Sequence, residues 1–247
     1  MKSTVMWIKR QGIMRWVLLA VLIFIGVRST SQIFYVNMGT SKSIGPVHKG
    51  KIQNAYLLPY SGDNYKYFSP FSYYILGRAY VHSTIHTTVL DGYKICESTC
   101  DGISFRVMEC SNKKGGSMFP HRTHQNGTSL DFMTPLMKKG KQHKFFDRIG
   151  IFRYALNFDK DGVLKLNKKV SIDYENMARH ILAMEEAARK NGMYIKKVIF
   201  KINLKDNLFD TESGKRLQSS GIYFAQSLPK SIDNLHDDHY HVDFGFL

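Results

Sequence analysis

Residues 171–204, SIDYENMARHILAMEEAARKNGMYIKKVIFKINL, decide the fold class, because a helix and a strand follow one another directly. Either Ser171 or Asp173 can cap the start of the helix. Four apolar residues follow helical spacing and form one face: Met177, Ile181, Met184 and Ala188. Asn191-Gly192 predicts the end of the helix. Residues 195–204 then alternate in part, which predicts a strand.

Outward from this segment, runs rich in aromatic and β-branched residues predict further strands. These strands cover residues 67–95, 105–110 and 239–246, and a turn at Asp159 to Gly162 predicts a hairpin. Residues 32–60 are predicted to be an irregular lead-in. Strands, one main helix and more strands predict an α+β fold, with a largely antiparallel sheet, flanking helices and a single domain over residues 32–247.

Residues 1–31 have the pattern of a signal peptide or a short membrane anchor. Four basic residues precede the apolar run 16–27: Lys2, Lys9, Arg10 and Arg15. The run is shorter than the roughly 20 residues that a membrane span needs, and cleavage is allowed after Ser31. We therefore expect an exported, periplasmic protein, anchored in the inner membrane if the segment is not cleaved.

The chain is basic, with a formal net charge of +15. Such a charge fits a polyanionic neighbour or simply a soluble basic surface. Removing residues 1–31 leaves 30 basic against 20 acidic residues. Because an exported protein does not normally meet chromosomal DNA, nucleic acid is not an expected partner. Any membrane contact is expected only through the N-terminal segment.

Three cysteines lie close together in the sequence: Cys96, Cys100 and Cys110. In an oxidising compartment we expect one disulfide, from either Cys96 or Cys100 to Cys110, and one remaining thiol. A metal knuckle is the weaker interpretation, because the thiolates are few and their spacing is not C-x-x-C.

Half of the ten histidines fall in two short segments, HRTHQNGTSLD at 121–131 and HDDHYH at 236–241. His239 and His241 are two residues apart, so on a strand their side chains share one face. One of them can then bind a metal while the other faces a substrate. His82, His86 and His180, in contrast, are expected to be ordinary strand, surface or packing residues.

His124 and Asp131 can join the same site, because a turn at Gly127 brings the two ends of their segment together. With one histidine of the His239 and His241 pair they supply two nitrogens and one carboxylate oxygen. Three protein ligands leave a fourth tetrahedral position for water, as a catalytic zinc site requires. These donors suit Zn2+, although they also bind other divalent ions.

The stretch GGSMFPHRTHQNG at residues 115–127 resembles the first motif of the penicillin-insensitive murein endopeptidases. That family belongs to the zinc metallopeptidases that include lysostaphin, the D-Ala-D-Ala peptidases and hedgehog. Its first motif has paired glycines and H-x-S/T-H-Q-x-G before an Asp, and its last motif, H-D-x-H-x-H, resembles residues 236–241. The chain departs from the family at Thr128-Ser129 and at Asp238, where many relatives have histidine.

The resemblance implies that His124, Asp131 and His241 are the zinc ligands and that His239 is the catalytic histidine. His121 would lie close to the metal, as an additional ligand or beside the ligands, and the role of His236 stays open. The implied domain is a zinc metalloprotease, and the implied substrate is the D-alanyl to diaminopimelyl cross-link of peptidoglycan in the cell wall.

The mechanism must work without the helix-borne glutamate of H-E-x-x-H. His239 can assist the activation of water or, as imidazolium, stabilise the oxyanion. Asp237 or Asp238 either orients a neighbouring histidine or is a solvated loop residue. The alternative functions are a related D,D-carboxypeptidase, a non-catalytic wall-binding protein with a retained metal site, and a metal-dependent nuclease.

Overall fold

A five-stranded sheet in the order β11-β12-β7-β6-β4 forms the centre of the fold. The structure, a computed structural model, describes the backbone of residues 2–247 and the side chains from Met14 onward. The five strands are β4 (Tyr65–Tyr67), β6 (Phe105–Val107), β7 (Ser129–Met133), β11 (Met193–Ile199) and β12 (His239–Phe246). Only β4 and β6 pair in parallel, and the other neighbours are antiparallel.

Three smaller antiparallel sheets surround this centre. They are β1 (Lys42–Ile44) with β2 (Lys51–Gln53), β3 (Tyr56–Leu57) with β5 (Tyr80–Val81), and β8 (Leu136–Lys138) with β9 (Lys141–Gln142) and β10 (Ser171–Ile172). The lead-in at 32–60 therefore contains three short strands that were not predicted. The predicted α+β class with a largely antiparallel sheet is confirmed, whereas a single zinc-peptidase domain over 32–247 stays a prediction.

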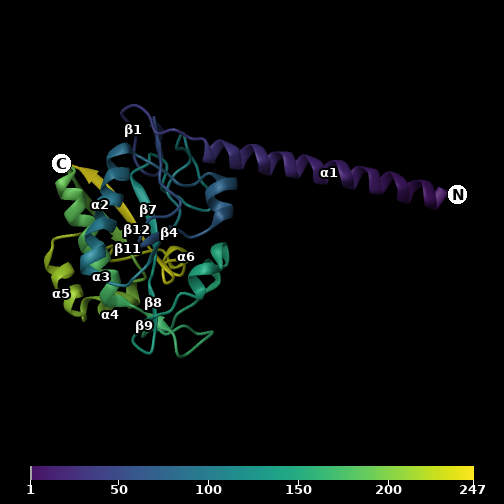
Figure 1. Cartoon of the computed structure of the whole chain (residues 1–247). Coiled ribbons are helices and arrows are strands. Elements are labelled where there is room, and N and C mark those ends of the chain that lie inside the picture. Colours follow the sequence, from purple (N-terminus) through teal and green to yellow (C-terminus); the bar gives the residue numbers. More distant parts are fainter. Residues whose placement is uncertain (1) are drawn as a thin grey trace.

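Helices flank the sheet, and α2 and α3 pack side by side against it (Figure 1). The longer helices are α1 (Lys2–Ile33), α2 (Ser83–Thr99), α3 (Tyr174–Lys190) and α5 (Glu212–Ser219). The short ones are the π-helix η1 (Phe71–Leu76), η2 (Phe146–Arg148), η3 (Gly150–Ala155), η4 (Ile202–Leu204), α4 (Lys205–Phe209) and α6 (Lys230–Asp233). Gly92 allows close packing of α2 on α3, because a Cβ there would meet the Met184 Sδ at 2.6 Å.

The strands predicted over residues 67–95 are mostly wrong, because η1 and α2 occupy this stretch. His82 caps α2, and its Nδ1 accepts a hydrogen bond from the backbone N–H of Thr84. The buried residues of α2 repeat at helical spacing, and they include Ile85, Val89, Tyr93 and Cys96. Burial of this face against α3 outweighs the β propensity of the threonines, valine and isoleucine.

The helix predicted after residue 171 is confirmed as α3, with Asp173 as its cap. The Asp173 Oδ1 accepts from the backbone N–H of Asn176, and the helix ends before Asn191. The strand that follows is shorter than predicted, because β11 ends at Ile199 and η4 comes next. The turn at Asp159 is present. However, η3 occupies much of residues 151–158, which were predicted to be the first strand of the hairpin.

The three cysteines are buried free thiols, so the expected disulfide is absent. In that expectation a bond from Cys96 or Cys100 to Cys110 would tie two adjacent strands. Instead, Cys96 lies on α2 and Cys100 forms the C-cap of that helix. The Cys110 thiol lies 3.7 Å from the carbonyl oxygen of Met108. All three therefore contribute to the apolar core.

His180 is a packing residue in the centre of the core, one of the two options expected from the sequence. Its ring is fully buried against Phe105 and Phe132, and its Nδ1 lies 2.7 Å from the Tyr240 hydroxyl. Burial lowers the pKa of His180 to about 3, because the charged form loses its hydration.

This burial predicts a specific acid sensitivity. Between pH 6.5 and about 3 the unfolded chain binds the proton at position 180 and the folded chain does not. Stability is therefore lost as pH falls through this window, with a slope of at most about 1.4 kcal/mol per pH unit from this group. Urea unfolding of His180→Gln with chelator present should show a shallower pH slope than the wild type. A substitution at the exposed His48 should leave the pH slope unchanged. Equal slopes for the wild type, the His180 variant and the His48 variant would contradict the prediction.

Candidate metal centre

The pairing of β7 with β12 brings the two histidine segments together. In this antiparallel pair His241 lies directly opposite Asp131, and His239 lies opposite Met133. Because side chains alternate along a strand, His239, His241 and Asp131 project from the same face. The strand predicted at 239–246 is confirmed, and so is the shared face of its two histidines.

His124 reaches the cluster from the loop before β7. Its backbone has φ +68°, a left-handed conformation that is uncommon outside glycine. The turn predicted at Gly127 is present with φ +79°, and a Cβ there would collide with the Ile52 side chain. The sequence thus places a glycine where the loop must pass closely over the sheet, and this passage directs His124 toward Asp131.

The three residues predicted as ligands lie in mutual contact. The Asp131 Oδ1 is 3.2 Å from His124 Nε2 and 2.8 Å from His241 Nδ1. The two ring nitrogens are 3.0 Å apart, and all three side chains are buried. Donors bound to one tetrahedral zinc ion at 2.0–2.1 Å are separated by roughly 3.3 Å. The predicted triad therefore converges on one point.

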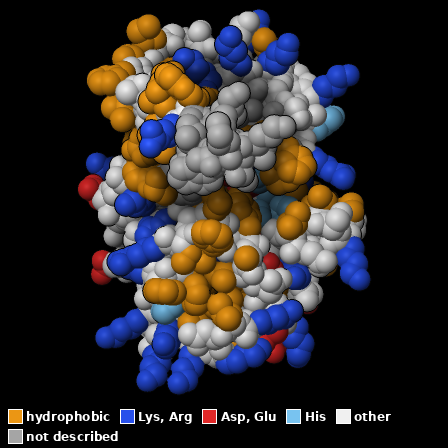
Figure 2. All heavy atoms as spheres, turned by 90° about the vertical axis from the view of Figure 1, so that its right-hand side faces the viewer, with side chains coloured by type: hydrophobic (Ala, Val, Ile, Leu, Met, Phe, Trp, Pro, Cys, Tyr) orange, Lys and Arg blue, Asp and Glu red, His pale blue; other side chains and the backbone are white. Residues whose placement is uncertain are grey.

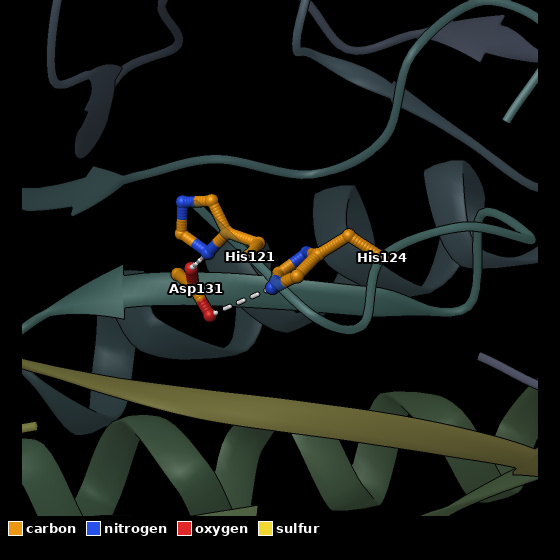
Figure 3. A group of neighbouring side chains, drawn as sticks. All are labelled: His121, His124 and Asp131. Carbon is orange, nitrogen blue, oxygen red and sulfur yellow. Dashed lines mark ion pairs between the residues drawn. The ribbon is translucent and has the colours of Figure 1, made fainter. Parts of the chain in front are cut away.

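His121 lies on the other side of the Asp131 carboxylate from His124. Figure 3 shows the rings of His121 and His124 directed at the Asp131 side chain. Its Nδ1 is 3.4 Å from Asp131 Oδ2. His121, His124 and Asp131 each offer one ligand atom within 4.8 Å of the others, so this group can hold a metal ion. His121 thus joins two of the predicted ligands, His124 and Asp131, in this group.

The electrostatics of the cluster fit a bound cation. Burial opposes ionisation of Asp131, but the rings of His124 and His241 hold the pKa of this carboxyl well below its ordinary value. Burial lowers the pKa of His124, which favours the neutral imidazole that metals bind. Two buried atoms, Asp131 Oδ2 and His124 Nδ1, have no hydrogen-bond partner among the described residues. A cation beside Asp131 would compensate its buried charge.

Asp243 supports His241 from behind and was not predicted. Its Oδ1 is 2.7 Å from His241 Nε2 and accepts from the Ser129 hydroxyl, while Oδ2 pairs with Lys197. Burial lowers the pKa of His241, but Asp243 and Asp131 outweigh this and raise it to about 10. Asp243 could have been found from the sequence, because it lies two residues after His241 on the same predicted strand and therefore on the same face.

Replacing Asp243 with alanine should weaken the metal site without removing a ligand. Carboxylates that orient metal-bound histidines typically contribute 10–100-fold to metal affinity, and we expect a loss of about that size. Competition with a chromogenic chelator measures it. Asp238→Ala is the matched control, because Asp238 holds the neighbouring His239 at the same 2.7 Å. Equal affinities for wild type and Asp243→Ala would contradict this role.

Glu109 supports His121 and was also missed. It accepts from the Ser72 hydroxyl at 2.8 Å, pairs with Arg78 at 3.0 Å, and forms an ion pair with the His121 ring. Burial opposes its ionisation, but the hydrogen bond from His121 helps to lower the pKa of Glu109. Glu109 could have been noticed in the sequence, because it is the one acidic residue at the otherwise apolar end of the strand predicted at 105–110.

His239, the predicted catalytic histidine, lies beside the cluster and is held by Asp238. Its Nδ1 is 2.7 Å from Asp238 Oδ1. Burial lowers the pKa of His239, but Asp238 outweighs this and raises it. Asp238 is buried and contacts this histidine, which fits the expected alternative that it orients a neighbouring histidine and not that it is a solvated loop residue. Asp237 is buried as well, but it pairs with Lys201 at 3.0 Å instead.

Two further side chains border His239. The His236 ring lies 4.8 Å from it, with its Nδ1 2.7 Å from the Ile232 carbonyl oxygen. Burial lowers the pKa of His236 to about 3. Tyr154 of η3 packs its ring edge-on against His239 at 5.5 Å, and its buried hydroxyl has no hydrogen-bond partner among the described residues. Nothing in the sequence near Tyr154 pointed to this position.

These contacts form a buried cluster that could hold a metal ion, beside a carboxylate-held histidine and a tyrosine hydroxyl that has no hydrogen-bond partner among the described residues. Such an arrangement can position a metal-bound water next to groups that move protons and donate hydrogen bonds. No protein-family model and no curated protein sequence matches this chain.

Proposed function

We propose that this chain is an exported, zinc-dependent peptidoglycan hydrolase that cuts the D-alanyl to diaminopimelyl cross-link. The observation that carries the proposal is the convergence of His124, Asp131 and His241 within 3.2 Å, with the Asp238-held His239 on the same strand face. The order of the two histidine motifs, which resembles that of murein endopeptidases, supports this substrate.

The donor set supports zinc as the metal. His124, Asp131 and His241 would hold the ion, with His121 as a candidate fourth contact. When bound, zinc lowers the pKa of a coordinated water to about 7 and polarises a carbonyl group. Asp243 and Glu109 keep the ligand rings in place, because each binds the ring nitrogen that faces away from Asp131.

His239 is the proposed proton-transfer residue. Asp238 binds its Nδ1, so Nε2 is the nitrogen that can exchange a proton with water or with the leaving amine. Tyr154 is a candidate hydrogen-bond donor to the oxyanion. Burial raises its pKa well above the ordinary value, so its hydroxyl keeps the proton that such a donor needs.

Export and anchoring are supported by α1. Its segment Met14–Ile33 is long and apolar enough to cross a membrane, which fits a signal sequence or an anchor. Basic residues before the segment favour a cytoplasmic N-terminus, which would place the site on the outer side of that membrane. The proposed location is therefore the periplasmic side of the inner membrane, where cross-linked peptides and anionic wall polymers are in reach.

Purified muropeptide dimers test the function directly. Zinc-loaded wild type should release monomers, a chelator should stop the reaction, and added zinc should restore it. Release of terminal D-alanine alone would instead identify a D,D-carboxypeptidase. A zinc-loaded protein that cuts neither bond would favour a wall-binding role, and nicking of plasmid DNA would favour a nuclease.

A further inference from the structure

The last turns of α1 are fixed to the folded domain by specific contacts. The Arg28 guanidinium donates to the carbonyl oxygens of Ile75 and Leu76 at the end of η1, at 3.0 and 3.1 Å. The Tyr80 hydroxyl donates to Gln32 Oε1 at 2.8 Å, and Gln32 is buried. These contacts set the direction in which α1 leaves the domain (Figure 1).

Large apolar side chains are exposed on the side from which α1 leaves. We call four of them the apolar collar: Phe71 (48 % exposed), Phe119 (86 %), Ile151 (42 %) and Phe152 (71 %). Phe71 begins η1, and Ile151 and Phe152 lie on η3, which packs against η1. The carbonyl of Phe119 accepts from Arg78, which closely follows η1.

Figure 2 views the face from which α1 projects. Apolar side chains gather in the middle and lower part of this face, and basic side chains line its edges. Histidine side chains are visible in a hollow between the apolar areas. An exposed apolar area with a basic rim is what a protein presents to a membrane surface with anionic lipids.

If α1 is the uncleaved anchor of the proposed function, its length holds the domain close to the bilayer. At 1.5 Å per residue, the unbroken apolar run 16–27 spans about 18 Å, well short of the hydrocarbon core of about 30 Å. The 20-residue segment Met14–Ile33 reaches that thickness, but its last turns are those docked on η1. Ser29 and Ile33 even share a shallow groove of 340 Å³ with Phe71, Tyr74 and Ile75.

We propose that the apolar collar inserts into the interfacial layer of the same phospholipid bilayer that α1 crosses. The domain then rests on the membrane through η1 and η3 as well as through its anchor. Aromatic rings favour this layer, where their apolar faces leave water. The proposal rests on the proposed role of α1 as an uncleaved anchor and does not depend on the hydrolytic activity.

The same contact brings the metal centre close to the lipid surface. Ser72 of η1 donates to Glu109, and Glu109 holds the His121 ring. On the other side, Tyr154 of η3 packs against His239. The two helices that carry most of the apolar collar therefore also border the cluster, which places the cluster next to the membrane.

Depth-dependent fluorescence quenching on the full chain tests the contact. The chain has two tryptophans, and Trp7→Phe with Trp16→Phe provides a silent background. Phe119→Trp and Phe152→Trp then report on the apolar collar in nanodiscs of phosphatidylethanolamine and phosphatidylglycerol with brominated acyl chains. Leu247→Trp is the matched control, because Leu247 is 72 % exposed and the C-terminus lies on the opposite side of the domain (Figure 1).

We expect brominated lipid to quench emission at positions 119 and 152 and to leave position 247 unchanged. Absence of quenching at both collar positions would overturn the proposal. Equal quenching at all three positions would overturn it too, because it would indicate unspecific adsorption. A blue shift at 119 and 152 without quenching, together with crosslinked dimers, would show that a second copy covers the apolar collar and would also refute membrane contact.

Discussion

Asp131→Ala is expected to abolish both metal binding and muropeptide hydrolysis. Asp131 is the one residue that contacts all three neighbouring rings, those of His121, His124 and His241. Its carboxylate is the only negative ligand in the proposed set. A bound ion would supply several kcal/mol of transition-state stabilisation, so we expect hydrolysis to fall by at least about 1000-fold. Metal analysis after gel filtration and quantified muropeptide products measure the two effects.

The control for this substitution must separate loss of metal from loss of fold. Asp131→Asn keeps the size of the buried side chain and removes its charge, so it should lose metal while circular dichroism stays unchanged. Asp161→Ala, at an exposed turn, should retain both properties. If Asp131→Ala binds zinc at wild-type stoichiometry, Asp131 is not a ligand, and the proposed site is wrong.

His239→Ala should have the second largest effect and should separate chemistry from metal binding. Loss of a general acid or base typically lowers the rate 10²–10⁴-fold, and we expect kcat to fall by about this factor. Zinc content should remain at the wild-type value, because His239 contacts Asp238 and not the cluster ligands. The assays are steady-state hydrolysis of muropeptide dimers and metal analysis of the same preparations.

His48→Ala is the control for the loss of a histidine as such, since His48 is exposed. It should leave kcat unchanged. Two results would contradict the role of His239. One is loss of zinc together with activity, which would make it a ligand, and the other is an unchanged kcat with zinc retained.

Local periodicity explains why part of the site was predictable from the sequence. The two-residue step from His239 to His241 defines one strand face without knowledge of the partner strand. The glycine at 127 marks a turn, so His124 and Asp131 could be expected to meet. The pairing that places Asp131 opposite His241 joins residues 110 positions apart. Its register depends on tertiary packing, and the sequence pattern alone did not supply it.

The missed residues share a different property, which is contact across distant segments. Glu109 approaches the cluster from the segment just after β6 and Tyr154 from η3, and no motif connects either of them to the histidines. The misassigned stretch at 67–95 has a related cause. Its β-branched residues favour a strand locally, but α2 gains more by burying Ile85 and Val89 against the core.

Strand β12 also determines when the proposed site can first form. Both His239 and His241 lie on β12 and are synthesised well after His124 and Asp131. A nascent chain that still lacks this strand has His124 and Asp131 but neither the third proposed ligand nor the proton-transfer residue. The proposed site would therefore stay incomplete until β12 has been synthesised and has paired with β7.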